Sequence, residues 1–322
     1  MTDAEIPADM PCVDAVVIGR NEGERLRVCL ASLAGQVRRI VYVDSGSSDN
    51  SAELARGLGA EVVILESDRP FTAARARNAG LARLSGEGFV QLVDGDCAVD
   101  PAWVTTALAF AATHPGAVVI CGRRRERFPD ASVYNRLCDR EWDTPVGRAT
   151  ACGGDALMRL PALRAVGGYR EDLIAGEEPE LCLRLVRAGG EVWRIDAEMT
   201  LHDAAMTRFG QWWNRSRRAG HAFAEGAALH GTGPERHWVV EMRRALFWGG
   251  ALPVTAVLAG LGAAPGFALL LAWPLQVLRL SRRMGLEAAL FTVLGKLPEA
   301  QGVLGYHLNR LRKRRAALIE YR

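Results

Sequence analysis

The chain has 322 residues, 49% of them hydrophobic, which is enough to bury the core of a large α/β domain and to leave an appended region. Its seven cysteines are scattered and show no paired metal-ligand spacing, which excludes a small disulfide-stapled fold and predicts reduced thiols. The net charge of +3 conceals a basic C-terminal end, because ten basic and only three acidic residues lie within Arg279–Arg322.

The N-terminal residues 1–11 contain acidic side chains and lack the basic and apolar regions of a secretory signal. We therefore expect an N-terminal extension over 1–11 and a catalytic part that faces the cytoplasm.

Strand and helix patterns alternate four times in the first part of the chain. The expected strands are Asp14–Ile18, Arg39–Val43, Glu61–Leu65 and Phe89–Val93, and the expected helices are 22–34, 52–58 and 72–84. This alternation predicts an α/β fold with parallel strands joined by crossover helices. In such sheets, ligands bind beyond the carboxyl ends of the strands at a topological switch point.

The strand Phe89–Val93 runs directly into Asp94-Gly95-Asp96. Carboxylates are costly to bury unless they are paired or bind a metal, and these two suit Mg²⁺ or Mn²⁺ on a diphosphate. The glycine-rich phosphate loops of dinucleotide-binding and P-loop proteins are missing. A metal helped by Arg75 or Arg77 could hold the phosphates instead, although both arginines are equally consistent with a solvated helix face.

After Asp96 the pattern predicts a helix over 101–112 and a strand over 117–123, followed by a charged, irregular segment, 124–148, that is typical of a binding loop. The small-residue turn 151–157 comes next. Its glycines allow a close approach to a ligand or close packing within the protein, and we favour packing.

Glu177, Glu178 and Glu180 open a helix over 176–185. Acidic residues are common in a first helical turn because they interact favourably with the helix dipole. Together with the Asp94–Asp96 motif, however, the cluster indicates a general base. His202 follows a short strand near 192–195 and is either a third metal ligand, a substrate contact or an ordinary polar residue.

A helix over 209–228 carries Trp212, Trp213 and several arginines, which could hold a diphosphate or lie on lipid headgroups. Positions 245–278 then contain no charged residue and are flanked by arginines on both sides. This run is ambiguous between one tilted membrane span and a hairpin, and the flanking charge favours a hairpin. The alternative is a buried subdomain or an oligomer interface.

The end of the chain, with patterns at 286–294 and a basic run at 310–315, predicts amphipathic surface helices. Because the basic residues follow the apolar run, their expected partner is an anionic membrane and not nucleic acid. We therefore expect a catalytic domain over 12–230 and a membrane-associated helical region over 231–322.

Five motifs, taken in order, resemble those of family 2 of the inverting glycosyltransferases. The resemblance implies the nucleotide-sugar-binding GT-A fold, a Rossmann-like mixed α/β sheet flanked by helices, here with a C-terminal hydrophobic helical membrane element. The resemblance covers about residues 12–225 and rests on residues 16–22, 44–49, 76–81, 94–96 and 176–178. The hydrophobic C-terminal region is similar to that of membrane-associated, succinoglycan-type members, which build exopolysaccharide repeat units on a lipid carrier.

This resemblance implies roles for individual residues. Asp44 and its loop would contact the nucleoside, Asp94 the ribose or diphosphate and Asp96 the metal, and Glu178 would occupy the place of the catalytic base. Beyond the resemblance, we expect Asp94 and His202 to join Asp96 as metal ligands. The full set expected to bind the donor is Arg20, Asn21, Glu22, Asp44, Ser45, Asp49, Arg77, Asn78, Asp94 and Gly95. Two positions depart from the family pattern, since Ser45 and Glu178 stand where aspartate is usual.

The sequence thus predicts a glycosyltransferase dependent on Mn²⁺ or Mg²⁺ at the cytoplasmic face of the cell membrane. It would move one sugar from a nucleoside-diphosphate sugar to a hydroxyl of a lipid-linked or other saccharide acceptor. The alternatives are a sugar nucleotidyltransferase, for which Gly19-Arg20-Asn21-Glu22 is a poor phosphate loop, and an inactive membrane scaffold. The sequence does not indicate an oligomeric state.

Overall fold

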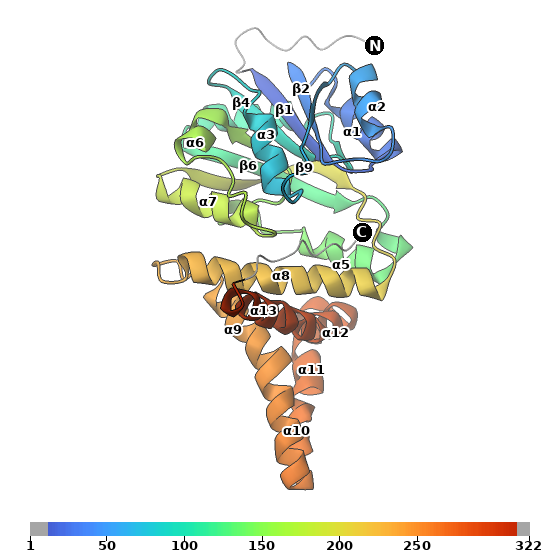
Figure 1. Ribbon diagram of the computed structural model, residues 1–322, viewed down its shortest axis with the longest axis vertical. Helices are drawn as coiled ribbons and strands as arrows, with labels where there is room; N and C mark the ends of the chain where they lie inside the picture. The colour runs from blue at the N-terminus through green and yellow to red at the C-terminus, as the bar shows by residue number, and fades with distance from the viewer. Residues whose placement is uncertain (1–11, 314–322) are drawn as a thin grey trace. The chain divides into compact units, whose positions relative to one another are not determined.

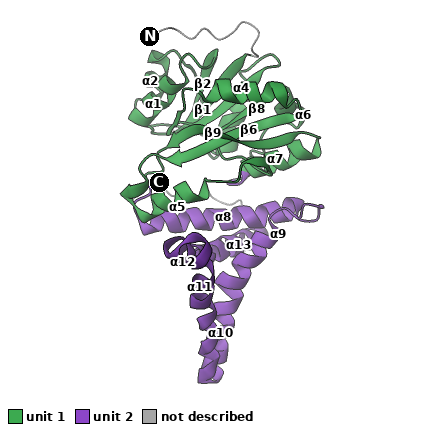
Figure 2. Ribbon diagram, turned by 180° about the vertical axis from the view of Figure 1, so that it is seen from behind, with its two compact units in different colours: residues 1–173, 177–205 green, residues 174–176, 206–322 purple. Residues whose placement is uncertain are grey.

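A computed structural model describes residues 12–313, so the expected N-terminal extension and the end of the basic run 310–315 lie outside the described residues. The chain forms two compact units (Figure 2), one of residues 1–173 and 177–205 and the other of residues 174–176 and 206–322. The units divide after Ala205 and not at the expected boundary of 230, because helix α8 (Phe209–His230) packs against α13 (Lys296–Leu311) within unit 2.

The first half of unit 1 follows the expected alternation of strand and helix (Figure 1). Its elements are β1 (Val13–Gly19), α1 (Glu24–Leu33), β2 (Arg39–Asp44), α2 (Ser51–Gly57), β3 (Glu61–Ile64), α3 (Ala73–Leu81) and β4 (Phe89–Asp94). The apolar centres of β1, β2 and β4 are buried, as a sheet covered on both faces requires.

The first four strands form a parallel sheet in the order β3-β2-β1-β4. Strands β2 and β3 lie on one side of β1, and β4 lies on its other side. The chain therefore reverses its direction of strand addition at β1, and the topological switch point lies between β1 and β4. There the N–H of Gly95 donates to the carbonyl of Ile18 at 2.8 Å. The loops after β1 and β4 therefore meet where a ligand is expected.

The second half of unit 1 makes the sheet mixed, because β8 pairs antiparallel with both β4 and β6. Its elements are β5 (Cys97–Val99), α4 (Trp103–Thr113), β6 (Ala117–Glu126), η1 (Pro129–Ala131), α5 (Val133–Glu141), β7 (Gly147–Ala149), β8 (Ala156–Arg159), α6 (Leu160–Ala165), α7 (Glu177–Arg187) and β9 (Glu191–His202). The full order is β3-β2-β1-β4-β8-β6-β9-β5, with β7 on β9.

Two expectations for this half were wrong. Segment 124–148 is not irregular, since β6 continues through it to Glu126 and Ser132 caps helix α5 by accepting a hydrogen bond from the N–H of Asn135. The strand expected near 192–195 is longer, because β9 continues through a bulge along β6 and then pairs with β5. His202 consequently ends the strand and does not lie in a loop after it.

In unit 2, the uncharged run forms a helical hairpin, one of the two arrangements that the sequence left open. After α8 come α9 (Val239–Leu246), η2 (Phe247–Ala251), α10 (Leu252–Gly262), η3 (Ala264–Leu271), α11 (Ala272–Met284), α12 (Leu286–Leu294) and then α13. In both ribbon views the leg that ends in α10 runs side by side with the returning leg formed by η3 and α11 (Figures 1 and 2).

The two legs of this hairpin are in direct contact. Gly260 lies against the ring of Phe267, and the indole N–H of Trp273 donates to the carbonyl of Trp248 at 3.2 Å. The continuous helices 239–262 and 264–284 are each long and apolar enough to cross a membrane by length and composition, and only 17% and 0% of their most apolar windows are buried. Within the described residues, the hairpin is therefore largely exposed and does not form a buried core.

Candidate active site

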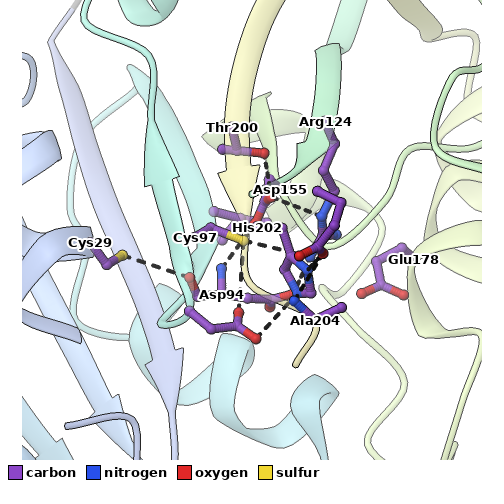
Figure 3. A network of polar contacts seen from close by, with 12 residues as sticks. Cys29, Asp94, Cys97, Arg124, Asp155, Glu178, Thr200, His202 and Ala204 are labelled. Atoms are coloured by element: carbon purple, nitrogen blue, oxygen red, sulfur yellow. Dashed lines mark hydrogen bonds and ion pairs between the residues drawn. The ribbon is translucent and has the colours of Figure 1, made fainter. Parts of the chain in front are cut away.

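Asp94, at the carboxyl end of β4, contacts two arginines, of which Arg124 is labelled in Figure 3. Its Oδ1 is 2.8 Å from the guanidinium of Arg77 and its Oδ2 is 3.3 Å from that of Arg124. Burial by itself would raise the pKa of Asp94, but the two guanidinium groups outweigh this effect and lower it. Asp94 is therefore held as an anion.

Arg77, only 2% exposed, joins Asp94 to the acidic start of α7. The same guanidinium lies 2.6 Å from Glu178 Oε1 and 3.2 Å from Glu177 Oε1. Burial, followed by the charge of Glu177, raises the pKa of Glu178 from 4.5 to about 7 despite Arg77. A carboxyl group with a pKa near neutrality suits a general base.

Asp96 and His202 lie beside this network. Asp96 is 2% exposed, and its Oδ2 is 3.2 Å from Nε2 of His202. His202 is directly opposite Cys97 in the antiparallel pair β5–β9, which brings its ring to the residue that follows Asp96. Ligand atoms of Asp96, Cys97 and His202 lie within 4.8 Å of one another, as in a metal site.

The chemistry of these donors fits Mn²⁺ or Mg²⁺. The described carboxylates of the network outnumber its cationic groups, which leaves an excess of buried negative charge for a cation to neutralise. The carboxylates are Asp94, Asp96, Glu126, Asp155, Glu177 and Glu178, and the groups able to carry positive charge are Arg77, Arg124 and, when protonated, His202. Asp96 and His202 would hold the metal. Asp94, also predicted as a ligand, directs both oxygens to guanidinium groups.

The loops after β1 and β2 hold each other in place. The N–H of Asn21 donates to Ser47 Oγ at 2.9 Å, and Asn21 Oδ1 accepts from the N–H of Ser48 at 2.7 Å. Asp44, 2% exposed, accepts hydrogen bonds from the backbone of Gly46 and Ser47 and from the hydroxyl of Tyr42. Asp44 thus shapes the loop predicted to bind the nucleoside, and Ser45 is half-buried within it.

The remaining predicted donor contacts surround this loop. The guanidinium of Arg20 lies 5.7 Å from the ring centroid of Phe71, and Glu22 forms an ion pair with Arg25 at 2.8 Å.

Two of the predicted residues have roles within the fold. Asp49 Oδ1 accepts from the N–H of Ser51 at the start of α2. Asn78 donates to the carbonyl of Tyr169 at 2.8 Å and accepts from its N–H at 2.9 Å. The structure therefore brings Arg77, Asp94 and Glu178 into one network with the Asp96–His202 pair beside it, whereas Asp49 and Asn78 hold neighbouring segments.

Sequence reasoning missed Asp155 and Arg124. Asp155 is fully buried and accepts hydrogen bonds from the N–H of Asp94 at 3.0 Å and from the hydroxyl of Thr200 at 2.8 Å. The Nε atom of Arg124 lies 3.5 Å from its second oxygen. The sequence did contain a signal for Asp155, because this charged residue directly precedes the apolar run 156–158.

Gly154 explains the small-residue turn before Asp155. A Cβ atom at this position would lie 2.5 Å from Asp94 Oδ2 and 3.0 Å from the guanidinium of Arg77. The preference for close packing over ligand contact in this turn agrees with that geometry.

This sheet, with its acidic residues at the switch point, is a GT-A fold. The structure is similar to that of mannosyltransferase PcManGT from Pyrobaculum calidifontis, solved with GDP-Man and Mn²⁺, with a TM-score of 0.64 and 20% identity over 92% of this chain and 88% of that one. It is also similar to Staphylococcus aureus TarS 1-349, with a TM-score of 0.54 and 15% identity over 88% of this chain and 90% of that one.

Residues 14–149 match the model of glycosyl transferase family 2. Over 185 residues it is 28% identical to the succinoglycan biosynthesis protein ExoA of Rhizobium meliloti, covering 54% of this chain and 55% of that protein. Over 229 residues it is 26% identical to the pre-mycofactocin glycosyltransferase of Mycobacterium tuberculosis, covering 68% of this chain and 48% of that protein. The chain thus spans about half the length of these relatives.

Proposed function

We propose that this protein is an inverting glycosyltransferase that uses a nucleoside-diphosphate sugar and a divalent cation, Mn²⁺ or Mg²⁺. The observation that carries the proposal is the guanidinium of Arg77, which joins Asp94 at the switch point to Glu178 on α7. This contact brings a group for donor binding and a group with the pKa of a base into one site. The family match and the Mn²⁺-containing neighbour support the same reaction class.

In the proposed reaction, Glu178 removes the proton from a hydroxyl group of the acceptor. The hydroxyl oxygen forms a bond to the anomeric carbon from the face opposite the diphosphate, and the bond between that carbon and the phosphate oxygen breaks with its electron pair on oxygen. The attack inverts the anomeric configuration, and the proton remains on Glu178 until solvent takes it up.

The other residues bind and orient. Asp94 receives the ribose or diphosphate, the loops around Asn21 and Asp44 receive the nucleoside, and Asp96 with His202 holds the metal. When bound, the divalent cation would neutralise charge on the departing diphosphate. Arg77 keeps Glu178 and Asp94 at fixed positions throughout.

We propose that the acceptor is a lipid-linked saccharide at the cytoplasmic face of the cell membrane. The hairpin of α10 and α11 supports this because its exposed side chains include Leu258, Leu261 and Leu275 and its uncharged part is flanked by arginines. Such a surface favours the interior of a bilayer, with the arginines among the headgroups. The similarity to a succinoglycan biosynthesis protein supports a role in surface-polysaccharide synthesis.

A thermal-shift panel tests the donor site. The full-length protein in detergent would be heated with each nucleoside diphosphate, with and without Mn²⁺. Binding stabilises the folded state by about 2.7 kcal/mol at a hundredfold excess over Kd. We expect one nucleotide to raise the melting temperature only when Mn²⁺ is present. If no nucleotide does so, the proposal of a metal-assisted donor site is wrong.

A further inference from the structure

The imidazole ring of His202 lies between two buried carboxylates, Asp96 directly before strand β5 and Glu126 at the end of strand β6. On one side, Asp96 Oδ2 is 3.2 Å from Nε2, and on the other, Glu126 Oε2 is 3.9 Å from Nδ1. The strand pairing creates this arrangement, because Glu126 ends β6 directly beside His202 in the parallel pair β6–β9. Each ring nitrogen therefore faces one carboxylate.

Glu126 is fixed before any ligand binds. It is 3% exposed, and its Oε1 accepts from the N–H of Phe128 at 3.0 Å and from the side-chain amide of Asn135 at 3.1 Å. Its Oε2 accepts from the N–H of Ala204 at 3.0 Å. These three donors are neutral, so they orient the carboxylate without cancelling its charge.

The ring nitrogen of His202 that faces Glu126 lacks a hydrogen-bond partner among the described residues. Its Nδ1 atom is buried and makes no hydrogen bond within residues 12–313, because 3.9 Å to Glu126 exceeds hydrogen-bonding distance. The edge of the ring packs on Trp142, with centroids 4.7 Å apart and planes at 83°. The ring is thus held between Trp142 and two carboxylates, with a fixed acceptor close to its unpaired nitrogen.

We propose that Glu126 is a positioning residue for the metal site. Its carboxylate would accept a hydrogen bond from the Nδ1–H group of His202. In the tautomer protonated at Nδ1, the lone pair of Nε2 faces Asp96, where a divalent cation would bind. The inference rests on the proposed function for the metal site at Asp96 and His202. A carboxylate behind a metal-binding histidine fixes the tautomer and ring orientation, and its loss typically weakens metal binding about 10- to 100-fold.

Mn²⁺ binding to the full-length protein, measured from the electron paramagnetic resonance signal of free Mn²⁺, tests the role without an activity assay. We expect Glu126→Gln, which keeps the size of the side chain, to weaken binding about 10- to 100-fold. The same substitution in a His202→Ala background should have no further effect, because Glu126 acts through His202. Asn135→Ala loosens Glu126 and keeps its charge, so it should cause a smaller loss that also depends on His202.

The outcomes separate this inference from the proposed function. If the wild-type protein binds no Mn²⁺ even with a nucleoside diphosphate, both the metal site and the role of Glu126 are wrong. If the wild type binds Mn²⁺ and Glu126→Gln binds it equally well, only the role of Glu126 is wrong. An equal loss with and without His202 would likewise overturn it, since that pattern indicates a general structural effect. Should Glu126→Gln not fold, Asn135→Ala in the two backgrounds decides the question.

Discussion

Arg77 and Glu178 are 100 or so residues apart in sequence, yet the guanidinium of one lies 2.6 Å from the carboxylate of the other. The same guanidinium binds Asp94 at 2.8 Å. The proposed base and the proposed donor contact therefore share one cation. A substitution at any of these three residues should change the electrostatic environment of the other two.

Replacing Glu178 with glutamine should remove transfer and leave donor binding intact. Loss of a general base typically lowers the rate about 10²- to 10⁴-fold. Glu178→Asp introduces the residue usual in the family, whose side chain is one methylene shorter. This variant should retain part of the activity. Turnover and the nucleotide-dependent thermal shift would be measured together. An active Glu178→Gln protein would move the base to a neighbouring carboxylate.

The reaction rate should rise with pH through about 7. The pKa of Glu178 is raised to about 7 by burial and by Glu177, and a base acts only when it is deprotonated. The slow side of the profile is therefore the acidic side. The rate at limiting donor from pH 5.5 to 8.5 would reveal this step, and a profile that is flat across pH 7 would contradict the assignment.

The same carboxyl group should make stability depend on pH. The folded state binds the Glu178 proton more tightly than the unfolded state, because the pKa is about 7 against 4.5. The stabilisation is complete below pH 4.5 and is lost as the pH rises through about 7. Across this pH range, the free energy of urea unfolding should decline less for Glu178→Gln than for the wild type. An identical decline in the two proteins would contradict the raised pKa of Glu178.

Removing the Arg77 guanidinium should destabilise unit 1 strongly. Arg77→Ala leaves three carboxylates without their shared cation, and breaking a buried pair in this way typically costs about 3–5 kcal/mol. Arg83→Ala is the matched control, because it removes an exposed arginine that pairs with Glu61 and should cost about 1 kcal/mol or less. Equal melting temperatures for the two variants would refute the proposed importance of the buried contact.

A methyl group at position 154 should damage the site, whereas one at 153 should be tolerated. A Cβ on Gly154 would lie 2.5 Å from Asp94 Oδ2, but a Cβ on Gly153 would meet only the end of Arg124 at 3.5 Å. Overpacking of this kind costs about 1–3 kcal/mol. Gly154→Ala should therefore lose nucleotide binding and stability while Gly153→Ala keeps both, and similar behaviour of the two would contradict the model of close packing.

The hairpin prediction can be tested by flotation of the full-length protein with anionic lipid vesicles. Leu258→Glu and Leu275→Glu place charges on its exposed surface, where the side chains are 66% and 63% exposed. A charge at the centre of a membrane helix costs about 2.5–3.5 kcal/mol, so the double variant should float less. Ile64→Glu, at an exposed position of the edge strand β3, is the control and should float like the wild type. Unchanged flotation of the double variant would remove the hairpin as the lipid-binding element.

Local patterns predicted much of this fold. The alternation up to β4 and the position of Asp94 and Asp96 follow from apolar periodicity and polar strand ends, which neighbouring residues determine. The role of Asp155 does not, because it depends on the placement of β8 between β4 and β6. The length of β9 was also missed, since its far end is stabilised by pairing with β5, more than 100 residues earlier in the chain.

The contribution of Glu126 was hidden for a related reason. It was assigned to an irregular segment because its strand does not end at the last apolar residue, and its contact with His202 arises only when β6 and β9 pair. The helix α5 was overlooked although Ser132 provides an ordinary N-cap. That signal was available in the sequence, whereas the contacts between strands were not.

The place of β9 has a consequence for synthesis of the protein on the ribosome. This strand is among the last elements of unit 1 to be made, yet it inserts between β6 and β5, and it carries His202. A nascent chain that has formed β1 to β4 already has a parallel sheet with Asp94 at its edge, but it lacks the partner of Asp96. Such non-local pairing is slow to form. The proposed metal site at Asp96 and His202 therefore forms only in the nearly finished unit, so metal-dependent nucleotide binding would report that folding of this unit is complete.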